Sequence, residues 1–471
     1  MNGTWLAAVF PHLALDLATR DTAIDDQALA ITEDMRGRPV VADCTATAEQ
    51  LGVRVGMTVA AALAVASELV LCERQPGAEA RALQRLAAWA YQFSGQVSLE
   101  PSTATLYLEI GGSRRLFGAP GPLREQLAHD LGVLGYRAMA GTAPTPAAAR
   151  LAARQGLDID SAEQLERYLA RLPLAALGLE PSELRALRGM GFRHARELLR
   201  LPRPDLARRL GPALLERLDR LRGHRPDPRP PWRPPEHYRA NLDLGTEVHE
   251  ASGLVFPLQR MIREFCGVLR GGDHGVQSVD IELRLREGRQ RLRLGLQAPG
   301  RDEARFMTLL RERLEHLQLS SPAVEITLQA SRLLPFDAPA TDLFGDSADI
   351  DSCLDPVLER LRARLGDDAV SGLGGVEEHR PEYSWRTPAP GADSPCPALP
   401  HRPAWLCQPP RPCVIADYQV LAGPERIETG WWDGRDCRRD YYVMRDPHGA
   451  ALWVYREYKP APGWYLHGIF G

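Results

Sequence analysis

The chain has 471 residues, of which 44% are hydrophobic and 25% are charged, so its length predicts about three or four domains with buried cores. The formal net charge of -4 excludes a uniformly basic nucleic-acid coat and leaves room for a locally basic face. The eight cysteines form no CxxC pair and no zinc-ligand spacing, which predicts reduced thiols and no metal site. No apolar run reaches the ~18–20 residues of a membrane helix, and no signal peptide is recognised. We therefore expect a cytoplasmic protein without membrane contact.

The first 160 residues predict a mixed α/β domain with antiparallel strands. Periodicity and the positions of Gly and Pro separate short strands from amphipathic helices. The expected strands are Trp5–Phe10, Ala28–Ile31, Pro39–Asp43, Val97–Glu100, Leu106–Ile110 and Met139–Gly141. The expected helices are Leu13–Ala18, Thr45–Leu51, Ala80–Phe93, Leu123–Leu134 and Pro146–Ala153. This order favours a mixed sheet over a doubly wound parallel one.

Four further segments follow this domain. Residues 161–223 predict short helices broken by Gly and Pro, followed by a linker rich in Pro and Arg. In 236–335, strands and helices alternate as a compact β-α-β-β-α-β unit. Residues 336–412 are rich in Pro, Asp, Ser and Gly and predict a flexible linker with one helix, Asp355–Leu365. The last segment, 413–471, is dense in Trp and Tyr and predicts a small β-domain.

Two short motifs resemble segments of the Y-family translesion DNA polymerases. Val53-Arg-Val-Gly-Met57 is similar to the GVxxGM segment of their fingers, and Gly141-Thr-Ala-Pro144 is similar to the GIAP strand of their palm. The resemblance implies a UmuC-like palm and fingers in 1–160, a helical thumb in 161–223 and a DNA-binding little finger in 236–335. With its aromatic end, the whole chain resembles the ImuB family, the inactive polymerase homologues of bacterial mutagenesis cassettes.

The metal-binding carboxylates of that family are mostly replaced here. Nucleotidyl transfer uses two divalent metals about 4 Å apart, held mainly by carboxylate oxygens. The resemblance places the family's acidic positions at Val9, Pro11, Glu100 and Pro101, so only Glu100 keeps a carboxylate. One carboxylate cannot hold two metals, and we expect no catalytic residue, metal or cofactor in this chain.

The residues that grip the triphosphate in the family are also replaced. The tyrosine and arginine of the family's SYEAR stretch correspond to Ala46 and Glu49, and the lysine after the palm strand corresponds to Pro146. The aromatic sugar-gate pair corresponds to Leu13 and Ala14. Glu49 would repel a triphosphate, and the other substitutions would converge on the same pocket. The resemblance thus implies that the polymerase site has been lost.

An active but diverged polymerase is the alternative from another functional class. It would use Glu100 with Asp16 or Glu109 as substitute metal ligands, although both of these are also typical of solvated or capping residues. A third interpretation is an interaction protein without a DNA role, which predicts no salt-dependent DNA binding. A Mg²⁺- or Mn²⁺-dependent primer-extension assay separates the first two.

A helix-hairpin-helix turn is predicted in the thumb-like segment. Gly189 and Gly191 would let the backbone approach a DNA phosphate, and the next helix would present free amides to the anion. Arg188 and Arg193 flank the turn, and residues 171–239 contain 16 Arg against 8 acidic residues. The alternative is a glycine turn with a solvated arginine face. Contact with phosphates would be sequence-independent and salt-sensitive.

A second basic face is predicted in the little-finger-like unit. Period-two spacing along two neighbouring strands puts four arginines on one side of the sheet. This face either follows a DNA backbone or is the solvated side of a half-buried sheet. The four residues are Arg284, Arg286, Arg291 and Arg293.

A peptide that resembles the QLxLF motif for the β sliding clamp follows this unit. It comprises Ala340, Thr341, Asp342, Leu343 and Phe344. The Leu-Phe pair would fill an apolar pocket on the clamp, and flexible flanks would let the peptide reach it. Alanine stands where the family motif prefers glutamine.

The aromatic C-terminal segment is a predicted partner-binding region. Trp431, Trp432 and Trp464 are candidates either for the core of a small β-domain or for an interface, where aromatic side chains concentrate binding energy. The resemblance implies two partners for this region, the RecA-like ImuA protein and an error-prone DnaE-type polymerase. The sequence as a whole predicts an adaptor that joins damaged primer-template DNA, the clamp and these partners.

Overall fold

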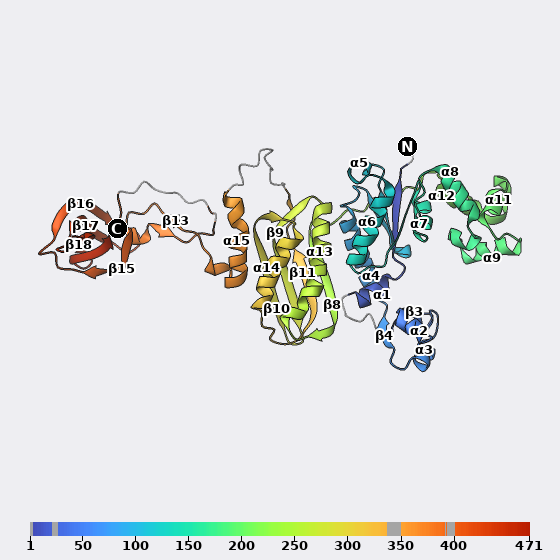
Figure 1. Cartoon of the computed structure of the whole chain (residues 1–471), viewed down its shortest axis with the longest axis horizontal. Coiled ribbons are helices and arrows are strands. Elements are labelled where there is room, and N and C mark those ends of the chain that lie inside the picture. The colour runs from blue at the N-terminus through green and yellow to red at the C-terminus, as the bar shows by residue number, and fades with distance from the viewer. Residues whose placement is uncertain (1–2, 21–26, 337–349, 391, 393–400) are drawn as a thin grey trace. The chain divides into compact units, whose positions relative to one another are not determined.

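The computed structural model describes residues 3–20, 27–336, 350–390, 392 and 401–471. The chain divides into two compact units, Met1–Arg364 and Leu365–Gly471, which are drawn in Figure 1. Among the described residues, no helix has both the length and the apolar character needed to cross a membrane.

The palm-like part of the first unit is a four-stranded antiparallel sheet in the order β5-β6-β1-β7. Its strands are β1 (Trp5–Val9), β5 (Val97–Glu100), β6 (Thr105–Glu109) and β7 (Met139–Ala143). Its helices are α1 (Leu13–Thr19), α4 (Pro76–Ala90), α5 (Arg114–Phe117), α6 (Pro120–Val133) and α7 (Pro146–Ala153). Because side chains alternate along a strand, Leu6 and Ala8 of β1 pack toward α4 and α6, whereas Ala7 and Val9 pack toward α7.

The fingers-like part is a small sheet in the order β3-β2-β4, with β2 and β4 parallel. Its elements are β2 (Leu29–Asp34), β3 (Pro39–Cys44), β4 (Val70–Glu73), α2 (Ala46–Gln50) and α3 (Val59–Val65). The expected strands and helices of this part are present, and α3 and β4 are additional. The motif Val53–Met57 connects α2 to α3 and packs its first residue into the core of this part.

The thumb-like part is helical, as expected. Its helices are α8 (Ala162–Arg171), α9 (Pro181–Gly189), α10 (Ala195–Leu199), α11 (Arg203–Leu210) and α12 (Pro212–Arg222). A single apolar core joins these helices to α7 and to the palm face that carries Val9. The thumb and the α7 face of the palm are therefore packed together.

The little-finger-like part is the predicted β-α-β-β-α-β unit, with strand order β10-β9-β11-β8. Its elements are β8 (Tyr238–Val248), α13 (Val255–Gly271), β9 (His274–Leu285), β10 (Arg289–Gly300), α14 (Glu303–Glu315) and β11 (Ala323–Ala330). A two-residue strand, β12 (Leu334–Pro335), pairs with β9, and α15 (Ile350–Leu365) follows.

Helix α13 packs closely against α4 of the palm, and their side chains belong to one continuous core. A Cβ on Gly267 would lie 2.1 Å from Trp89 Cδ1, and a Cβ on Gly271 would lie 2.8 Å from Tyr91 Cβ. Only glycine allows helices to approach this closely. A buried ion pair, Arg85 to Glu264 at 2.8 Å, crosses the same contact. The palm and the little-finger-like part are thus held together by side-chain packing and by this ion pair.

The second unit is a five-stranded antiparallel sheet in the order β15-β19-β18-β17-β16. Its strands are β15 (Trp405–Pro412), β16 (Gln419–Thr429), β17 (Cys437–Arg445), β18 (Ala451–Lys459) and β19 (Gly463–Ile469). Two short strands, β13 (Gly374–Gly375) and β14 (Trp385–Arg386), form a separate ribbon.

The prediction of a linker over 336–412 differs from the structure in two places. Helix α15 begins at Ile350 rather than Asp355, and Trp405–Pro412 forms strand β15 of the C-terminal sheet. The prolines in β15 suggested irregular backbone. They are accommodated because β15 is an edge strand that pairs only with β19, so its other side needs no N–H donors. The structural boundary between the units falls at Arg364.

Candidate functional site

Glu100, which the resemblance predicts to be the one acidic position retained, lies at the end of β5 beside the end of β1. Thr105 of β6 pairs with both Glu100 and Val9, so the three positions lie side by side on the palm sheet. The Glu100 carboxylate accepts hydrogen bonds from Tyr107 Oη at 2.8 Å and from Arg229 Nη1 at 2.8 Å. Arg150 Nη1 of α7 lies 3.9 Å from the same carboxylate. Glu100 is therefore neutralised by two guanidinium groups of the chain itself.

Arg229 reaches this position from the linker between the thumb-like and little-finger-like parts. Its guanidinium lies over the Tyr107 ring, 4.4 Å from the ring centroid, and also pairs with Asp227 at 3.1 Å. The linker is fixed nearby because Trp232 N donates to Val97 O of β5 at 2.8 Å. Burial raises the pKa of Tyr107, which remains a protonated donor to Glu100. No sequence pattern links Arg229 to Glu100.

Asp16 and Glu109 both have structural roles. Asp16 is buried, and its carboxylate accepts from Arg137 N at 2.9 Å and from Arg137 Nε at 2.6 Å. Burial raises the pKa of Asp16 in spite of these bonds. Glu109 accepts from Gly111 N at 3.0 Å and from Gly112 N at 3.3 Å, which caps a turn. Across the described ranges, no three His, Cys, Asp or Glu residues are grouped as a metal site.

The segments that would correspond to the triphosphate grip cap helices instead. Thr45 Oγ1 accepts from Ala48 N at the start of α2, and Thr145 Oγ1 accepts from Ala148 N at the start of α7. Thr145 Oγ1 also donates to Leu221 O of the thumb at 2.9 Å. Glu49 is exposed on α2. These residues therefore stabilise local structure and the palm–thumb contact.

The predicted helix-hairpin-helix turn lies between α9 and α10. Gly191 has φ +88°, a left-handed conformation that favours glycine, and nothing lies within 4 Å of a Cβ built on Gly189 or Gly191. Arg188 and Arg193 are exposed and form no ion pair among the residues described here. The turn is therefore open, and both flanking arginines are exposed to solvent.

The backbone amides after the turn are already occupied. Glu197 accepts from Arg193 N at 2.7 Å and from His194 N at 3.2 Å, closing the first turn of α10. These two backbone hydrogen bonds hold the pKa of Glu197 below its usual value. A phosphate would have to displace this carboxylate to reach the amides, so binding here depends on the arginine side chains.

The four little-finger arginines all have carboxylate partners. Arg284 pairs with Glu325 at 2.6 Å and Arg291 with Glu282 at 2.8 Å. Arg286 pairs with an exposed glutamate and Arg293 with an aspartate, at 3.3 and 3.7 Å. Strand β9 carries Arg284, and its neighbour β10 carries Arg291 and Arg293. Arg286 comes directly after the last residue of β9. All four arginines of this face are thus in ion pairs, and DNA phosphates would have to compete with their carboxylate partners.

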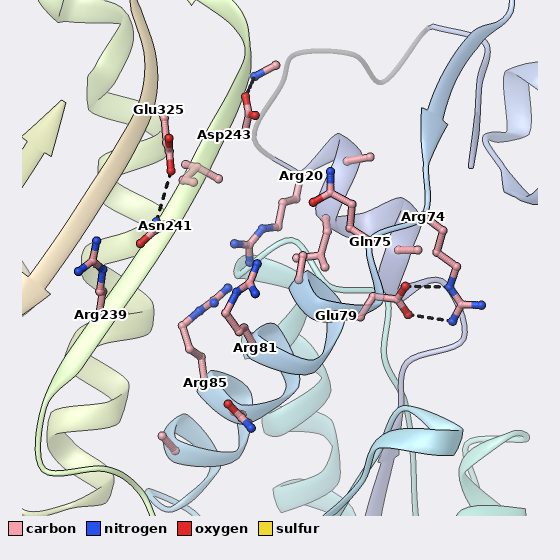
Figure 2. Close-up of a pocket in the computed structure, with 18 of the residues that line it drawn as sticks. Arg20, Arg74, Gln75, Glu79, Arg81, Arg85, Arg239, Asn241, Asp243 and Glu325 are labelled. Atoms are coloured by element: carbon pink, nitrogen blue, oxygen red, sulfur yellow. Dashed lines mark hydrogen bonds and ion pairs between the residues drawn. The ribbon is translucent and has the colours of Figure 1, made fainter. Parts of the chain in front are cut away.

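A groove between the palm and the little-finger-like part was not foreseen from the sequence. It has a volume of about 850 Å³ and is lined by α1, α4, β8 and the linker. Figure 2 shows Arg20, Arg81 and Arg85 pointing toward one another in it. Arg20 and Arg85 are held by Glu264, whereas Arg81 of α4 and Arg239 of β8 are exposed, with no ion pair within the described parts of the chain. The residues that line the groove come from distant parts of the sequence, so no local sequence motif predicts it.

The predicted clamp-binding peptide, 340–344, lies outside the described residues.

The three C-terminal tryptophans differ in their exposure to solvent. Trp431 and Trp432 are exposed on the turn between β16 and β17, with ring centroids 5.5 Å apart. Arg380 holds this turn through Asp433 at 2.7 Å. Trp464 of β19 is partly buried and packs beside Tyr442. The first two therefore remain interface candidates, and the third mainly contributes to the core.

Comparison with known proteins adds three results. A family model described as the impB/mucB/samB family matches residues 12–154. Protein ImuB of Caulobacter vibrioides, in strains NA1000 / CB15N and ATCC 19089 / CIP 103742 / CB 15, is 29% identical over 460 residues, covering 89% of this chain and 100% of the relative.

Two solved structures also resemble the chain. A Y-family DNA polymerase chimera, Dbh-Dpo4(243-245)-Dbh, has a TM-score of 0.43 at 15% identity and covers 69% of this chain and 98% of its own. DinB from Sulfolobus solfataricus has a TM-score of 0.41 at 15% identity, with coverages of 71% and 100%.

Residues 12–154 are thus similar to the impB/mucB/samB family, and most of the chain is similar to ImuB; both similarities support the class of UmuC/DinB-like homologues of the Y-family polymerases. The mixed α/β parts with an added C-terminal β-domain agree with this class. The similarity to ImuB covers 89% of the chain, so it includes parts of the palm, thumb, little finger and C-terminal unit. The predicted fold class and the resemblance are confirmed.

Proposed function

We propose that the chain is a non-catalytic polymerase homologue that acts as an adaptor in translesion synthesis and damage-induced mutagenesis. It would connect damaged primer-template DNA, the β sliding clamp and an error-prone DnaE-type polymerase, with the RecA-like ImuA protein as a further partner. Synthesis would be carried out by the partner polymerase. The observation that carries the proposal is the pairing of Glu100 with Arg229 and Arg150.

The electrostatics at Glu100 support this proposal. A catalytic site must collect enough carboxylate charge to hold two divalent cations close together. Here the Glu100 carboxylate lies beside two guanidinium groups, and one of them, Arg229, also pairs with Asp227, so the cluster carries no excess negative charge. A divalent cation would have to displace Arg229 and would still meet the repulsion of Arg150.

The alternative of an active, diverged polymerase has less support. Its substitute ligands would be Asp16 and Glu109, and both carboxylates accept two hydrogen bonds from neighbouring groups of the fold. Freeing Asp16 would leave Arg137 without its partner, and freeing Glu109 would open the turn at Gly111. An interaction protein without a DNA role is disfavoured by Arg188 and Arg193 of the thumb turn and Arg81 and Arg239 of the groove, which have no ion pair among the described residues.

The first experiment measures DNA binding and primer extension on the same primer-template. We expect salt-dependent, sequence-independent binding and no extension with either Mg²⁺ or Mn²⁺. Replacing Arg188 and Arg193 together by alanine should reduce the slope of log K against log salt by about 2, because each phosphate contact contributes about 0.9. The same double substitution at Arg81 and Arg239 tests the groove.

Two controls make this experiment decisive. Arg386→Ala with Arg445→Ala removes two exposed arginines from the C-terminal unit and should leave the slope unchanged. Arg284→Ala with Arg291→Ala should have a smaller effect than the thumb variant, since these arginines must first leave carboxylates. Extension that disappears in Glu100→Gln would contradict the non-catalytic proposal, and wild-type binding without salt dependence would contradict the DNA role.

Clamp docking is tested by the peptide 340–344. Purified wild-type chain should bind a β sliding clamp, and Leu343→Ala with Phe344→Ala should weaken binding at least tenfold, because these side chains would fill the apolar pocket. Leu373→Ala, which truncates an exposed leucine of the C-terminal unit, is the matched control and should bind normally. Equal binding by all three proteins would exclude this peptide as the docking site.

A further inference from the structure

Helix α15 is anchored to the little-finger-like part by a buried carboxylate. Glu359 is only 2% exposed, and it accepts from Gln297 N of β10 at 2.6 Å and from Arg305 Nε of α14 at 2.7 Å. A second bond from Arg305 Nη2, at 2.6 Å, makes the ion pair bidentate. Ala363, one turn later, joins the core of this part. The orientation of α15 about its axis is therefore fixed.

The opposite face of α15 is apolar and exposed. Leu354, Val357, Leu361 and Leu365 are 49%, 52%, 41% and 60% exposed. Their spacing of three, four and four residues places them within about 80° of one another around an ideal helix. Figure 1 shows α15 on the side of the little-finger-like part away from the palm. A stripe of this kind is typical of a helix that packs against another helix or a groove.

Charged residues flank the stripe in an asymmetric way. Asp355 lies near the beginning of the described helix, and Arg360, Arg362 and Arg364 lie near its end. Asp355 and Arg362 are on the same flank of the stripe at 100° per residue. Both side chains are half-buried. Arg362 Nε is buried and has no hydrogen-bond partner among the described residues, and neither residue forms an ion pair with them. Arg360 differs from these two because it pairs with Glu312 at 2.9 Å.

We propose that the apolar stripe of α15 is the interface with a second copy of this chain, formed by two α15 helices packed antiparallel about a two-fold axis. Antiparallel packing brings the beginning of one helix beside the end of the other, so Asp355 of each copy lies level with Arg362 of the other. The leucines at the two ends of the stripe would contact each other, and Val357 would contact Leu361. Such an isologous contact is closed and self-complementary.

The charge pattern favours this occupant and this direction. Parallel packing would place the arginine-rich ends side by side, whereas antiparallel packing makes the Asp355–Arg362 pair twice. Asp355 and Arg362, which form no ion pair with the described residues, then each gain a partner of opposite charge. The inference concerns a surface that the proposed adaptor function does not use, and it holds or fails independently of DNA and clamp binding.

The test is sedimentation equilibrium of the full chain over a range of concentrations. We expect a monomer–dimer equilibrium for the wild type. Val357→Ser with Leu361→Ser should weaken dimerisation at least tenfold, while Leu373→Ser, at an even more exposed leucine of the other unit, should leave it unchanged. Both sites are exposed, so the substitutions leave the core intact.

A charge exchange separates this geometry from other contacts. Asp355→Arg and Arg362→Asp should each weaken the dimer at least threefold, and the double variant should recover wild-type affinity because the pair is restored with reversed signs. A wild type that is monomeric at all concentrations would overturn the proposal. A dimer that is insensitive to both the serine and the charge variants would also overturn it.

Discussion

Replacing Glu264 by alanine should destabilise the contact between the palm and the little-finger-like part by about 3–5 kcal/mol. The Glu264 carboxylate is 3% exposed and accepts from Arg85 Nε at 2.8 Å and from Tyr238 Oη at 3.3 Å. Arg20 Nη1 lies 3.6 Å away. Removal of the carboxylate leaves the Arg85 guanidinium buried and unpaired, and that uncompensated charge is the main cost.

The pKa of Glu264 supports the same expectation. Burial raises it, but the positive charges of Arg85 and Arg20, together with the hydrogen bonds from Arg85 and Tyr238, outweigh burial and hold it below its usual value. The carboxylate is therefore ionised at neutral pH and contributes stability there. This contribution is lost only as the pH falls through the lowered pKa.

Hydrogen exchange of the α13 amides measures this effect directly, because it reports local opening as well as global unfolding. Glu216→Ala is the matched control. Glu216 also pairs with an arginine at 2.8 Å, but both side chains are more than 40% exposed, so its loss should cost at most about 0.5 kcal/mol. If the two variants exchange equally, Glu264 does not hold the two parts together.

Acidification from pH 7 to 5 should destabilise the C-terminal unit through His467. This side chain is fully buried, its Nδ1 lies 2.9 Å from Tyr441 Oη, and its ring stacks on Trp453. Burial lowers the pKa of His467 to about 4, with Glu382 opposing and Arg439 reinforcing the shift. An unfolded histidine has a pKa of about 6.5 and takes up a proton first.

The direction of the change in stability follows from the difference between the pKa values of the folded and unfolded states. Below about pH 6.5 the unfolded state binds a proton that the folded state excludes, so stability falls until the pH reaches the folded pKa. The full effect between pH 7 and 4 is on the order of 3 kcal/mol, and about 2 kcal/mol of it should appear by pH 5. Carboxylates with lowered pKa values, such as Asp440, contribute mainly below this window.

The measurement is hydrogen exchange of β18 amides at pH 7 and 5, corrected for intrinsic rates. His467→Gln should remove most of the pH dependence, because glutamine does not titrate. His448→Gln, at an exposed position, should retain the wild-type dependence. A wild-type unit whose protection is the same at both pH values would show that His467 is not held neutral.

Local features were predicted well from the sequence. Strands such as Val97–Glu100 and helices such as Pro146–Ala153 follow from periodicity, proline positions and capping threonines, which act within a few residues. The error at Trp405–Pro412 has the same origin, since prolines exclude a central strand and an edge strand cannot be recognised without its neighbours. The correspondence of Val9 and Glu100 with the family's acidic positions is a prediction from motifs alone.

The sequence by itself therefore predicted the class of protein and the order of its parts, and the resemblance predicted that most of the family's acidic positions are replaced. Only the tertiary structure decided which groups surround Glu100, the position that keeps a carboxylate. It brings Arg229 to Glu100 across 129 positions and Arg85 to Glu264 across 179, and it places Glu197 on the amides of the thumb turn. Hydrophobic periodicity and turn chemistry are local properties of a chain. Ion pairs and grooves between distant segments depend on how helices and sheets pack, and packing is settled only when the whole core forms.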